Sequence, residues 1–357
     1  MKDGVVLVEP FLAGNAVAFV SGGKVQDFFI DFERSNWSLV GATFVGEVDR
    51  LSKNSNSCFV RLPKNQVGFL RRARGLKSGD KLLLQSRLFS PEDKAVLVST
   101  NLSFKGRYVI ITPRKKMLTF SRSISGKGIR QGLRTLGNKY QEIQNRKCGI
   151  IFRTLCKFAS EKKIKEDLEI QLERCRRVTA TKLNDIGLIE PPPNALQRAK
   201  QDWHSLESQE VIKEHQCFDK FGIWEQILLL RESSIKLPSG GNIRIEPTQA
   251  LVAIDVNTGS DSSPAASLRA NIQAITEIPR QLRLRGLGGK IVVEMGPLSR
   301  SHREKIESNL QKTIAPVPDK IRIAGWTALG NLELEKSRDR IPLGEIQFNQ
   351  IEKSMGV

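Results

Sequence analysis

The feature that most constrains the fold is residues 251–294, which read as strand, helix, strand. A short apolar run, residues 251–257, carries one carboxylate at Asp255, and a second run, residues 291–293, ends at Glu294. Between them, apolar residues recur at helical spacing: Leu268, Ile272, Ile275 and Leu282. Strands joined by a crossover helix lie parallel in one sheet, so the sequence predicts that the two carboxylates meet at the same sheet edge.

Asp255 and Glu294, with the amide of Asn257, predict a metal site. Carboxylate and amide oxygens at the carboxyl edge of a sheet suit Mg²⁺ rather than Zn²⁺. A metal held there would activate a water molecule and stabilise charge on a phosphoryl group. The alternative is that Asp255 caps the following loop and Glu294 is simply solvated, which is the more usual role of a single acidic residue at a strand end.

The sequence around this pair resembles the catalytic segment of the ribonuclease E/G family. The resemblance rests on Leu237-Pro-Ser-Gly-Gly241, on Asn271 and on Arg280-Gln-Leu-Arg-Leu-Arg285, together with the two runs described above. In that family the residues matching Asp255 and Asn257, with an aspartate at the position of Glu294, hold Mg²⁺. The resemblance therefore implies a Mg²⁺-dependent endoribonuclease that hydrolyses single-stranded RNA and leaves 5′-phosphate products.

Residues 38–103 contain five short strand-like runs, which predict a small barrel of the OB type. Six Lys and Arg residues and no acidic residue lie between Arg61 and Lys77, and Phe59 and Phe69 flank the start of this run. Such phenylalanines are either core residues or platforms on which bases stack, each stack contributing about 1–3 kcal/mol. In the resembled family this is an S1-type domain, in which Phe59 and Phe69 match two phenylalanines that grip a base and Lys94 matches a lysine that contacts RNA.

A second basic stretch, residues 105–130, has eight Lys and Arg residues and no acidic residue, a pattern that favours phosphate contact. An apolar run then ends at Arg153 and Thr154, which could supply bidentate and hydroxyl donors to a terminal phosphate. In the resembled family this pair, with residues matching Gly106 and Ile110, forms a pocket that senses the 5′-monophosphate of RNA. The alternative is that Arg153 is an ordinary cation at a strand end.

The resemblance extends from about Val5 to Pro342 and implies a multidomain fold of the α+β and α/β classes. A discontinuous ribonuclease-H-like scaffold would carry an inserted barrel and sensor segment, followed by a deoxyribonuclease-I-like catalytic domain. The implied bounds are 1–37 with 195–235 for the scaffold, 38–103 for the S1-type OB fold, 104–194 for the sensor, 236–345 for the catalytic domain and 346–357 for a tail. The patterns also predict an antiparallel sheet within residues 5–31, a helix over 158–177 and mainly helical structure over 195–230.

Composition limits the partners. The chain has 57 basic and 38 acidic residues in 357, a net charge of +19, which is typical of a protein that binds a polyanion. Charge alone would also fit a ribosome-bound or membrane-surface factor. The chain lacks both a transmembrane run and a signal-peptide layout at the N-terminus, so a cytoplasmic location is expected. The five cysteines lack zinc or disulfide spacing and are expected to be reduced.

The chain departs from the family pattern at four points. Glu294 replaces an aspartate, Gly296-Pro297 follows it, and Pro279 falls inside the predicted helix, where it should kink or restart the helix at a cost of about 3 kcal/mol. The cysteine pair that joins family subunits through zinc is absent, so a monomer or dimer is expected instead of a zinc-linked tetramer. These departures leave a rival interpretation, an RNA-binding paralogue that has lost cleavage.

Overall fold

The computed structural model describes residues 4–12, 14–31, 40–52, 56–90, 94–113, 117–143, 148–203, 210–261, 263–315 and 321–345. These residues belong to two compact units, one made of residues 1–33 and 205–357 and the other of residues 34–204. The predicted tail, 346–357, and the basic residues Arg114, Lys115 and Lys116 lie outside the described ranges.

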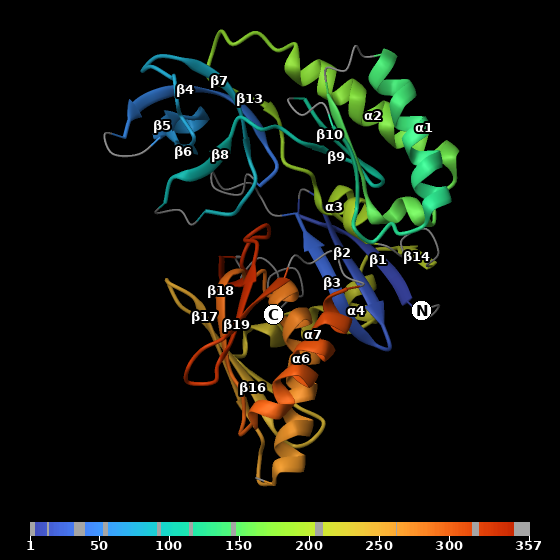
Figure 1. Ribbon diagram of the computed structural model, residues 1–357, viewed down its shortest axis with the longest axis vertical. Helices are drawn as coiled ribbons and strands as arrows, with labels where there is room; N and C mark the ends of the chain where they lie inside the picture. Colours follow the sequence, from blue (N-terminus) through green and yellow to red (C-terminus); the bar gives the residue numbers. More distant parts are fainter. Residues whose placement is uncertain are drawn as a thin grey trace. The chain divides into compact units, whose positions relative to one another are not determined.

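The unit of residues 34–204 contains the predicted barrel (Figure 1). Its strands are β4 (Thr43–Leu51), β5 (Ser57–Arg61), β6 (Val67–Arg71), β7 (Lys81–Ser86) and β8 (Val96–Ser99). They pair in the order β4-β5-β6-β8-β7, and β4 pairs with β7, which closes the barrel. Its interior is apolar, with Phe44, Val60 and Leu84 fully buried, and β13 (Gly187–Glu190) extends the sheet beside β4. The five-stranded OB-like barrel is therefore confirmed.

The rest of this unit is built on a second sheet, in the order β11-β12-β10-β9. Its strands are β9 (Phe104–Lys105), β10 (Val109–Thr112), β11 (Leu118–Phe120) and β12 (Gly149–Phe152), and its helices are α1 (Lys127–Ile143), α2 (Glu161–Thr179) and α3 (Ala195–Asp202). The predicted helix over 158–177 starts later, at Glu161, because the Ser160 side chain accepts the backbone N–H of Lys163 and caps it. A short 3₁₀ turn, η2 (Thr154–Lys157), precedes it.

In the other unit, β1 (Gly4–Phe11), β2 (Gly14–Ser21) and β3 (Lys24–Ile30) form the predicted antiparallel sheet. The expectation of mainly helical structure over 195–230 is wrong in part. Residues Glu210–Lys213 form β14, which pairs parallel with β1 at the edge of the sheet, and two short helices follow, α4 (Cys217–Lys220) and α5 (Ile223–Leu228). β14 is mostly exposed, so it lacks the apolar alternation by which a sequence reveals a strand. Trp203 and Trp224 are buried, as predicted.

A six-stranded sheet in this unit carries the strand-helix-strand segment. Its order is β15 (Ser234–Lys236), β16 (Asn242–Pro247), β17 (Val252–Asn257), β18 (Gly289–Glu294), β20 (Leu332–Lys336) and β19 (Ile321–Trp326). β17 and β18 are parallel and are joined by α6 (Pro264–Leu284), which confirms the predicted topology. Figure 1 shows α6 and α7 (Arg303–Ile314) running beside the sheet, and their apolar side chains share one core with Ile254, Val256, Ile291 and Val293.

Helix α6 is buried along most of its length because it also contacts the N-terminal sheet. Arg280 Nε donates to the Val25 carbonyl at 2.8 Å, and Arg283 Nη2 donates to the Gln26 carbonyl at 3.0 Å. Arg285 Nη2 donates to the Glu232 carbonyl at 2.7 Å. The three arginines of the Arg280–Arg285 motif therefore bind backbone within the fold. α6 does not restart at Pro279, which lies inside one continuous helix.

The observed class is a mixed α+β fold with a closed five-stranded barrel. All five cysteines are free and buried. Within the described ranges, no helix is both long enough and apolar enough to span a bilayer.

Candidate nucleic-acid interface and acidic site

Asp255 and Glu294 lie directly beside each other at the ends of β17 and β18. They are register partners in the parallel pair, and neighbouring strands are about 4.8 Å apart. Ile254, Val256 and Val293 face the helices, so alternation turns the two carboxylates to the opposite, open face of the sheet. Asp255 is half-buried and Glu294 is exposed. The predicted juxtaposition of these two residues is thus present in the fold.

Asn257 is held next to Asp255 by its own amide. Its Nδ2 donates to Asp255 Oδ2 at 2.7 Å and lies 3.4 Å from Asn242 Oδ1 on β16. The amide oxygen of Asn257 therefore points away from both acceptors. Position 241, just before β16, requires a glycine, because a Cβ there would collide with the Asn257 carbonyl oxygen. The close approach of these two backbones fixes the end of β17.

The end of β18 is fixed by a buried amide. Asn271 on α6 is fully buried, and its Nδ2 donates to the Gly296 carbonyl at 3.1 Å while its Oδ1 accepts the Gly296 N–H at 2.9 Å. This double hydrogen bond ties the chain two residues after Glu294 to the crossover helix. Asn271 therefore positions the strand end from which the Glu294 carboxylate projects.

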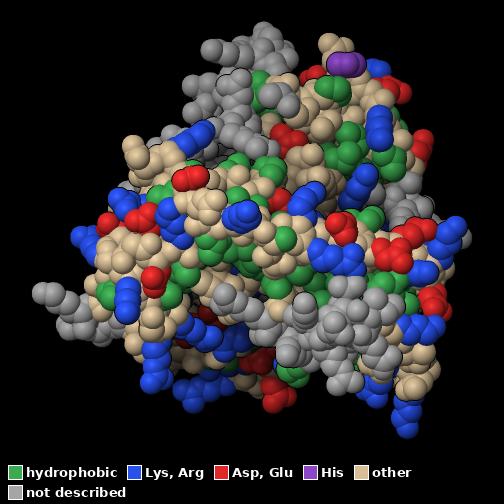
Figure 2. All heavy atoms as spheres, turned by 90° about the horizontal axis from the view of Figure 1, so that it is seen from above, with side chains coloured by type: hydrophobic (Ala, Val, Ile, Leu, Met, Phe, Trp, Pro, Cys, Tyr) green, Lys and Arg blue, Asp and Glu red, His purple; other side chains and the backbone are tan. Residues whose placement is uncertain are grey.

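The open face carries only slightly more acidic than basic side chains. Its six strands present five carboxylates and four cations on it: Glu246, Asp255, Glu294, Glu333 and Glu335, with Lys236, Arg244, Lys290 and Arg322. Elsewhere, Lys and Arg side chains are spread over the surface in view in Figure 2, with acidic side chains between them. The net charge alone therefore does not locate a binding surface.

The residues at this edge fit a hard divalent cation. Adjacent carboxylates repel each other unless a cation lies between them, and Mg²⁺ commonly uses one or two protein carboxylates while keeping several water ligands. The donor set is oxygen only, as Mg²⁺ prefers. The described part of the chain has no group of three or more His, Cys, Asp or Glu residues placed to hold a metal, so a site here would depend on the acidic pair.

The barrel presents a cross-strand row of side chains outside its core. Arg50, Phe59, Phe69 and Leu97 are neighbours on β4, β5, β6 and β8. The Phe59 and Phe69 ring centroids are 5.4 Å apart and both rings are half-buried, while the Arg50 guanidinium lies 4.6 Å from the Phe59 centroid. Lys94 is exposed just before β8. The two phenylalanines thus form one partly exposed aromatic pair beside a guanidinium.

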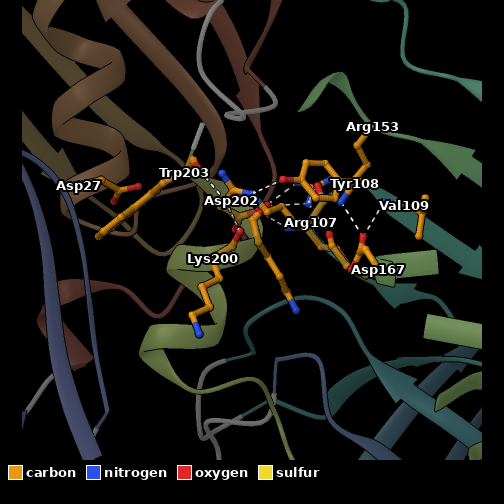
Figure 3. Close-up of polar contacts among 12 residues, drawn as sticks. Asp27, Arg107, Tyr108, Val109, Arg153, Asp167, Lys200, Asp202 and Trp203 are labelled. Carbon is orange, nitrogen blue, oxygen red and sulfur yellow. Dashed lines mark hydrogen bonds and ion pairs between the residues drawn. The ribbon is translucent and has the colours of Figure 1, made fainter. Parts of the chain in front are cut away.

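Arg153 lies among acceptors of the protein itself (Figure 3). Its Nη1 donates to the carbonyls of Gly106 and Gln201 at 2.6 Å each and to that of Arg107 at 3.1 Å, and its Nη2 lies 3.3 Å from Asp202 Oδ1. Burial lowers the pKa of Arg153, and the Asp202 carboxylate opposes that shift. The guanidinium therefore holds the 106–107 backbone against the C-terminal end of α3, where carbonyls and Asp202 are negative.

The other predicted sensor residues lie around this cluster. Asp167 on α2 accepts the backbone N–H groups of Tyr108 and Val109 at 2.7 and 3.0 Å, and a Cβ at Gly106 would collide with its carboxylate. Thr154 shares a hydroxyl hydrogen bond of 2.8 Å with Ser121, and Ile110 pairs with Ile151 of β12. Gly106 and Arg153 are thus in direct contact, whereas Thr154 is engaged by a different partner.

Sequence reasoning did not identify Asn242, Arg244, Asp167 or Asp202 as neighbours of these residues. For Asn242 and Arg244 a signal existed, because residues 242–246 alternate strictly between polar and apolar side chains and so predict a half-buried strand. No such signal exists for Asp167, which accepts from the backbone at 108–109, or for Asp202, which approaches Arg153, because both lie on helices distant in sequence from their partners.

Comparison with known proteins adds an independent finding. Residues 103–216 and 194–339 match the profile described as "Ribonuclease E/G family". A ribonuclease E of Synechocystis is 27% identical over 86% of this chain and 53% of its own length, and one of Buchnera aphidicola from Schizaphis graminum is 25% identical over 92% and 40%. Ribonuclease G of Escherichia coli is 22% identical over 94% of this chain and 80% of its own. The chain thus spans about half the length of these ribonucleases E.

Proposed function

The chain belongs to the ribonuclease E/G family, and on this premise we propose that it is a Mg²⁺-dependent endoribonuclease that cleaves single-stranded RNA. The observation that carries the proposal is the register pairing of Asp255 with Glu294 on the open face of the sheet. Two carboxylates held one strand spacing apart match the ligands that Mg²⁺ uses at phosphoryl-transfer sites.

In this proposal Asp255 and Glu294 hold the metal. Asn257 orients Asp255 through its 2.7 Å hydrogen bond, and its amide oxygen would join the site when the amide group turns. A bound Mg²⁺ supplies Lewis-acid stabilisation of phosphoryl charge and lowers the pKa of a bound water. In the reaction a water oxygen bonds to phosphorus, the P–O3′ bond breaks and a proton passes to O3′, so the products carry a 3′-hydroxyl and a 5′-phosphate.

Binding of the RNA strand is assigned to the barrel. Phe59 and Phe69 would stack bases, each stack contributing about 1–3 kcal/mol, and Lys94 would contact a phosphate. The half-buried aromatic pair with Arg50 beside it supports this role, since such platforms combine exposed rings with positive charge.

The deciding experiment compares wild type with Asp255→Asn on a short single-stranded RNA bearing a 5′-monophosphate, in Mg²⁺ or in EDTA. We expect wild type to cut the RNA in Mg²⁺ only. The cleavage rate of the variant should be at least about 100-fold lower, because the amide keeps the size of Asp255 but not its charge. Equal cleavage by Asp255→Asn would remove the proposed metal site.

A second candidate function is RNA binding without cleavage. Glu294 favours it, because its side chain is longer than the aspartate of the family pattern and so moves one carboxylate of the pair. The same experiment separates the two. RNA binding by wild type with no Mg²⁺-dependent products would support the binding function, whereas Mg²⁺-dependent cuts that Asp255→Asn loses would support the nuclease.

A preference for 5′-monophosphorylated RNA is a finer part of the proposal and is assigned to Arg153, Thr154, Gly106 and Ile110. The contact between Arg153 and Gly106 supports a shared pocket. Because Arg153 already donates to carbonyls and approaches Asp202, a terminal phosphate has to compete with these acceptors. We therefore expect cleavage of 5′-monophosphate RNA to exceed that of 5′-hydroxyl RNA by less than about tenfold, or about 1.4 kcal/mol. Equal rates would remove the sensor role.

A further inference from the structure

One cation on the open face of the six-stranded sheet lies next to the proposed metal site. Arg244 on β16 is the register partner of Asp255, which in turn is the partner of Glu294. The row Arg244–Asp255–Glu294 thus crosses three adjacent strands on one face. Directly opposite residues on antiparallel strands have Cβ atoms about 5 Å apart, so an arginine side chain is long enough to reach the space above the carboxylate pair.

The local contacts keep Arg244 on this face. Ile243 and Ile245 on either side of it are buried in the core, which turns residue 244 outward. Arg244 Nε lies 3.0 Å from Glu246 Oε1, two residues along the same face, and the Arg244 side chain is 60% exposed. The contact with Glu246 is made through Nε, and the side chain stays mostly exposed on the open face of the sheet.

We propose that Arg244 is a further catalytic residue, which binds a non-bridging oxygen of the scissile phosphodiester. This inference rests on the proposed nuclease function. A guanidinium presents a planar set of donors that matches two phosphate oxygens, and it stays charged at all working pH values. Charge on those oxygens rises in the transition state of phosphoryl transfer, so a fixed cation there lowers the barrier.

The competing role for Arg244 is structural. An arginine among carboxylates can simply neutralise Asp255 and Glu246 and stabilise the sheet. The two roles predict opposite effects on the metal. If Arg244 acts on the substrate, its removal takes a positive charge away from the acidic pair and Mg²⁺ binds at least as tightly as before. If Arg244 instead holds Asp255 in place, its removal weakens Mg²⁺ binding together with cleavage.

The experiment uses the full chain with Arg244→Gln, Arg244→Lys and the control Arg322→Gln. Arg322 lies on β19, on the same face of the sheet, and donates to Glu335 at 2.7 Å, three strands away from β17. The measurements are kcat and KM on single-stranded RNA at saturating Mg²⁺, and Mg²⁺ affinity of the RNA-free protein by titration calorimetry.

We expect Arg244→Gln to lower kcat about 10- to 100-fold, as for loss of one transition-state donor, with KM changed less than about threefold. Arg244→Lys should be intermediate because it keeps the charge and loses the planar fork. Arg322→Gln should stay within about twofold of wild type, and Mg²⁺ affinity should not fall in any variant.

Two results would overturn the inference while leaving the nuclease intact: a wild-type kcat for Arg244→Gln, or a loss of kcat accompanied by weaker Mg²⁺ binding. A wild-type chain that does not cleave RNA in Mg²⁺ would overturn the nuclease, and the role of Arg244 with it.

Discussion

The carboxylate at position 294 reaches one methylene further from its strand than the aspartate of the resembled family pattern. Its backbone position is nevertheless fixed closely, by the register with Asp255 and by the bonds of Asn271 to Gly296. Its side chain is exposed, so it can adopt several rotamers. Under the proposed function, the longer carboxylate would reach the metal by bending, at the cost of ordering one more torsion.

Glu294→Asp should consequently keep cleavage within about tenfold of wild type, whereas Glu294→Gln should lose at least about 100-fold, because it removes a charge that the metal needs. Initial rates on single-stranded RNA at saturating Mg²⁺ measure both. Glu335→Gln, on the same face and paired with Arg322, is the control and should be near wild type. Full activity in Glu294→Gln would contradict a ligand role.

Asn271→Ala should lower the free energy of unfolding by about 2–4 kcal/mol, because it leaves the buried Gly296 N–H and carbonyl without partners. Urea denaturation followed by circular dichroism measures this. The control is Asn309→Ala on α7, where a half-buried side chain donates an exposed hydrogen bond to the Lys305 carbonyl, and the expected loss is below about 1 kcal/mol. Equal losses of unfolding free energy in the two variants would show that the buried hydrogen bonds of Asn271 contribute no more than the single bond of Asn309.

At the scale of elements, α6 connects the acidic site to the N-terminal sheet. The helix contributes Asn271 to the end of β18 near its start and the arginines 280 and 283 to β3 near its end. This burial against two sheets explains how α6 continues through Pro279 despite the lost backbone donor. Packing on two sides outweighs a cost of about 3 kcal/mol that would break an isolated helix.

Pro279→Ala should therefore stabilise the chain, by about 1 kcal/mol, since it restores a donor to the Ile275 carbonyl while losing some buried ring contacts. The midpoint of urea denaturation measures the change. Pro264→Ala is the matched control, because Pro264 occupies the first turn, where a missing N–H costs nothing. Destabilisation by Pro279→Ala would mean that ring packing dominates.

At the scale of the whole molecule, each unit encloses buried thiols. Burial raises the pKa of Cys156 and of Cys175 to about 12, and that of Cys217 to about 11, from 9.0. Cys156 and Cys175 lie in the unit of residues 34–204, and Cys217 lies in the other. Both units therefore share the same alkaline sensitivity.

Thiol groups whose pKa is higher in the folded chain make the free energy of unfolding fall at alkaline pH. Above pH 9 the unfolded chain releases thiol protons that the folded chain keeps, so the unfolded state is favoured as pH rises. We expect the free energy of unfolding to be insensitive to these groups below pH 9 and to fall between about pH 9 and 12. Guanidinium titrations at several pH values measure this, and Cys156→Ala should show a shallower fall. An unchanged slope in that variant would remove Cys156 as a cause.

The sequence by itself determined the elements that local patterns encode. Alternating runs specify the strands of the barrel, and the strand-helix-strand pattern specifies that Asp255 and Glu294 share one sheet edge, because a crossover helix leaves few other topologies. Turn residues and periodicity act over a few positions, so they can be read from the chain alone.

Only the tertiary structure decided which partners each side chain meets. Arg153 reads as a free cation at a strand end, yet it binds carbonyls near residue 106 and near residue 201. Arg244 reads as one polar residue in an alternating run, yet the register of β16 with β17 sets it beside Asp255. Such contacts join segments distant along the chain and form only when the core forms. Local sequence patterns therefore do not predict them.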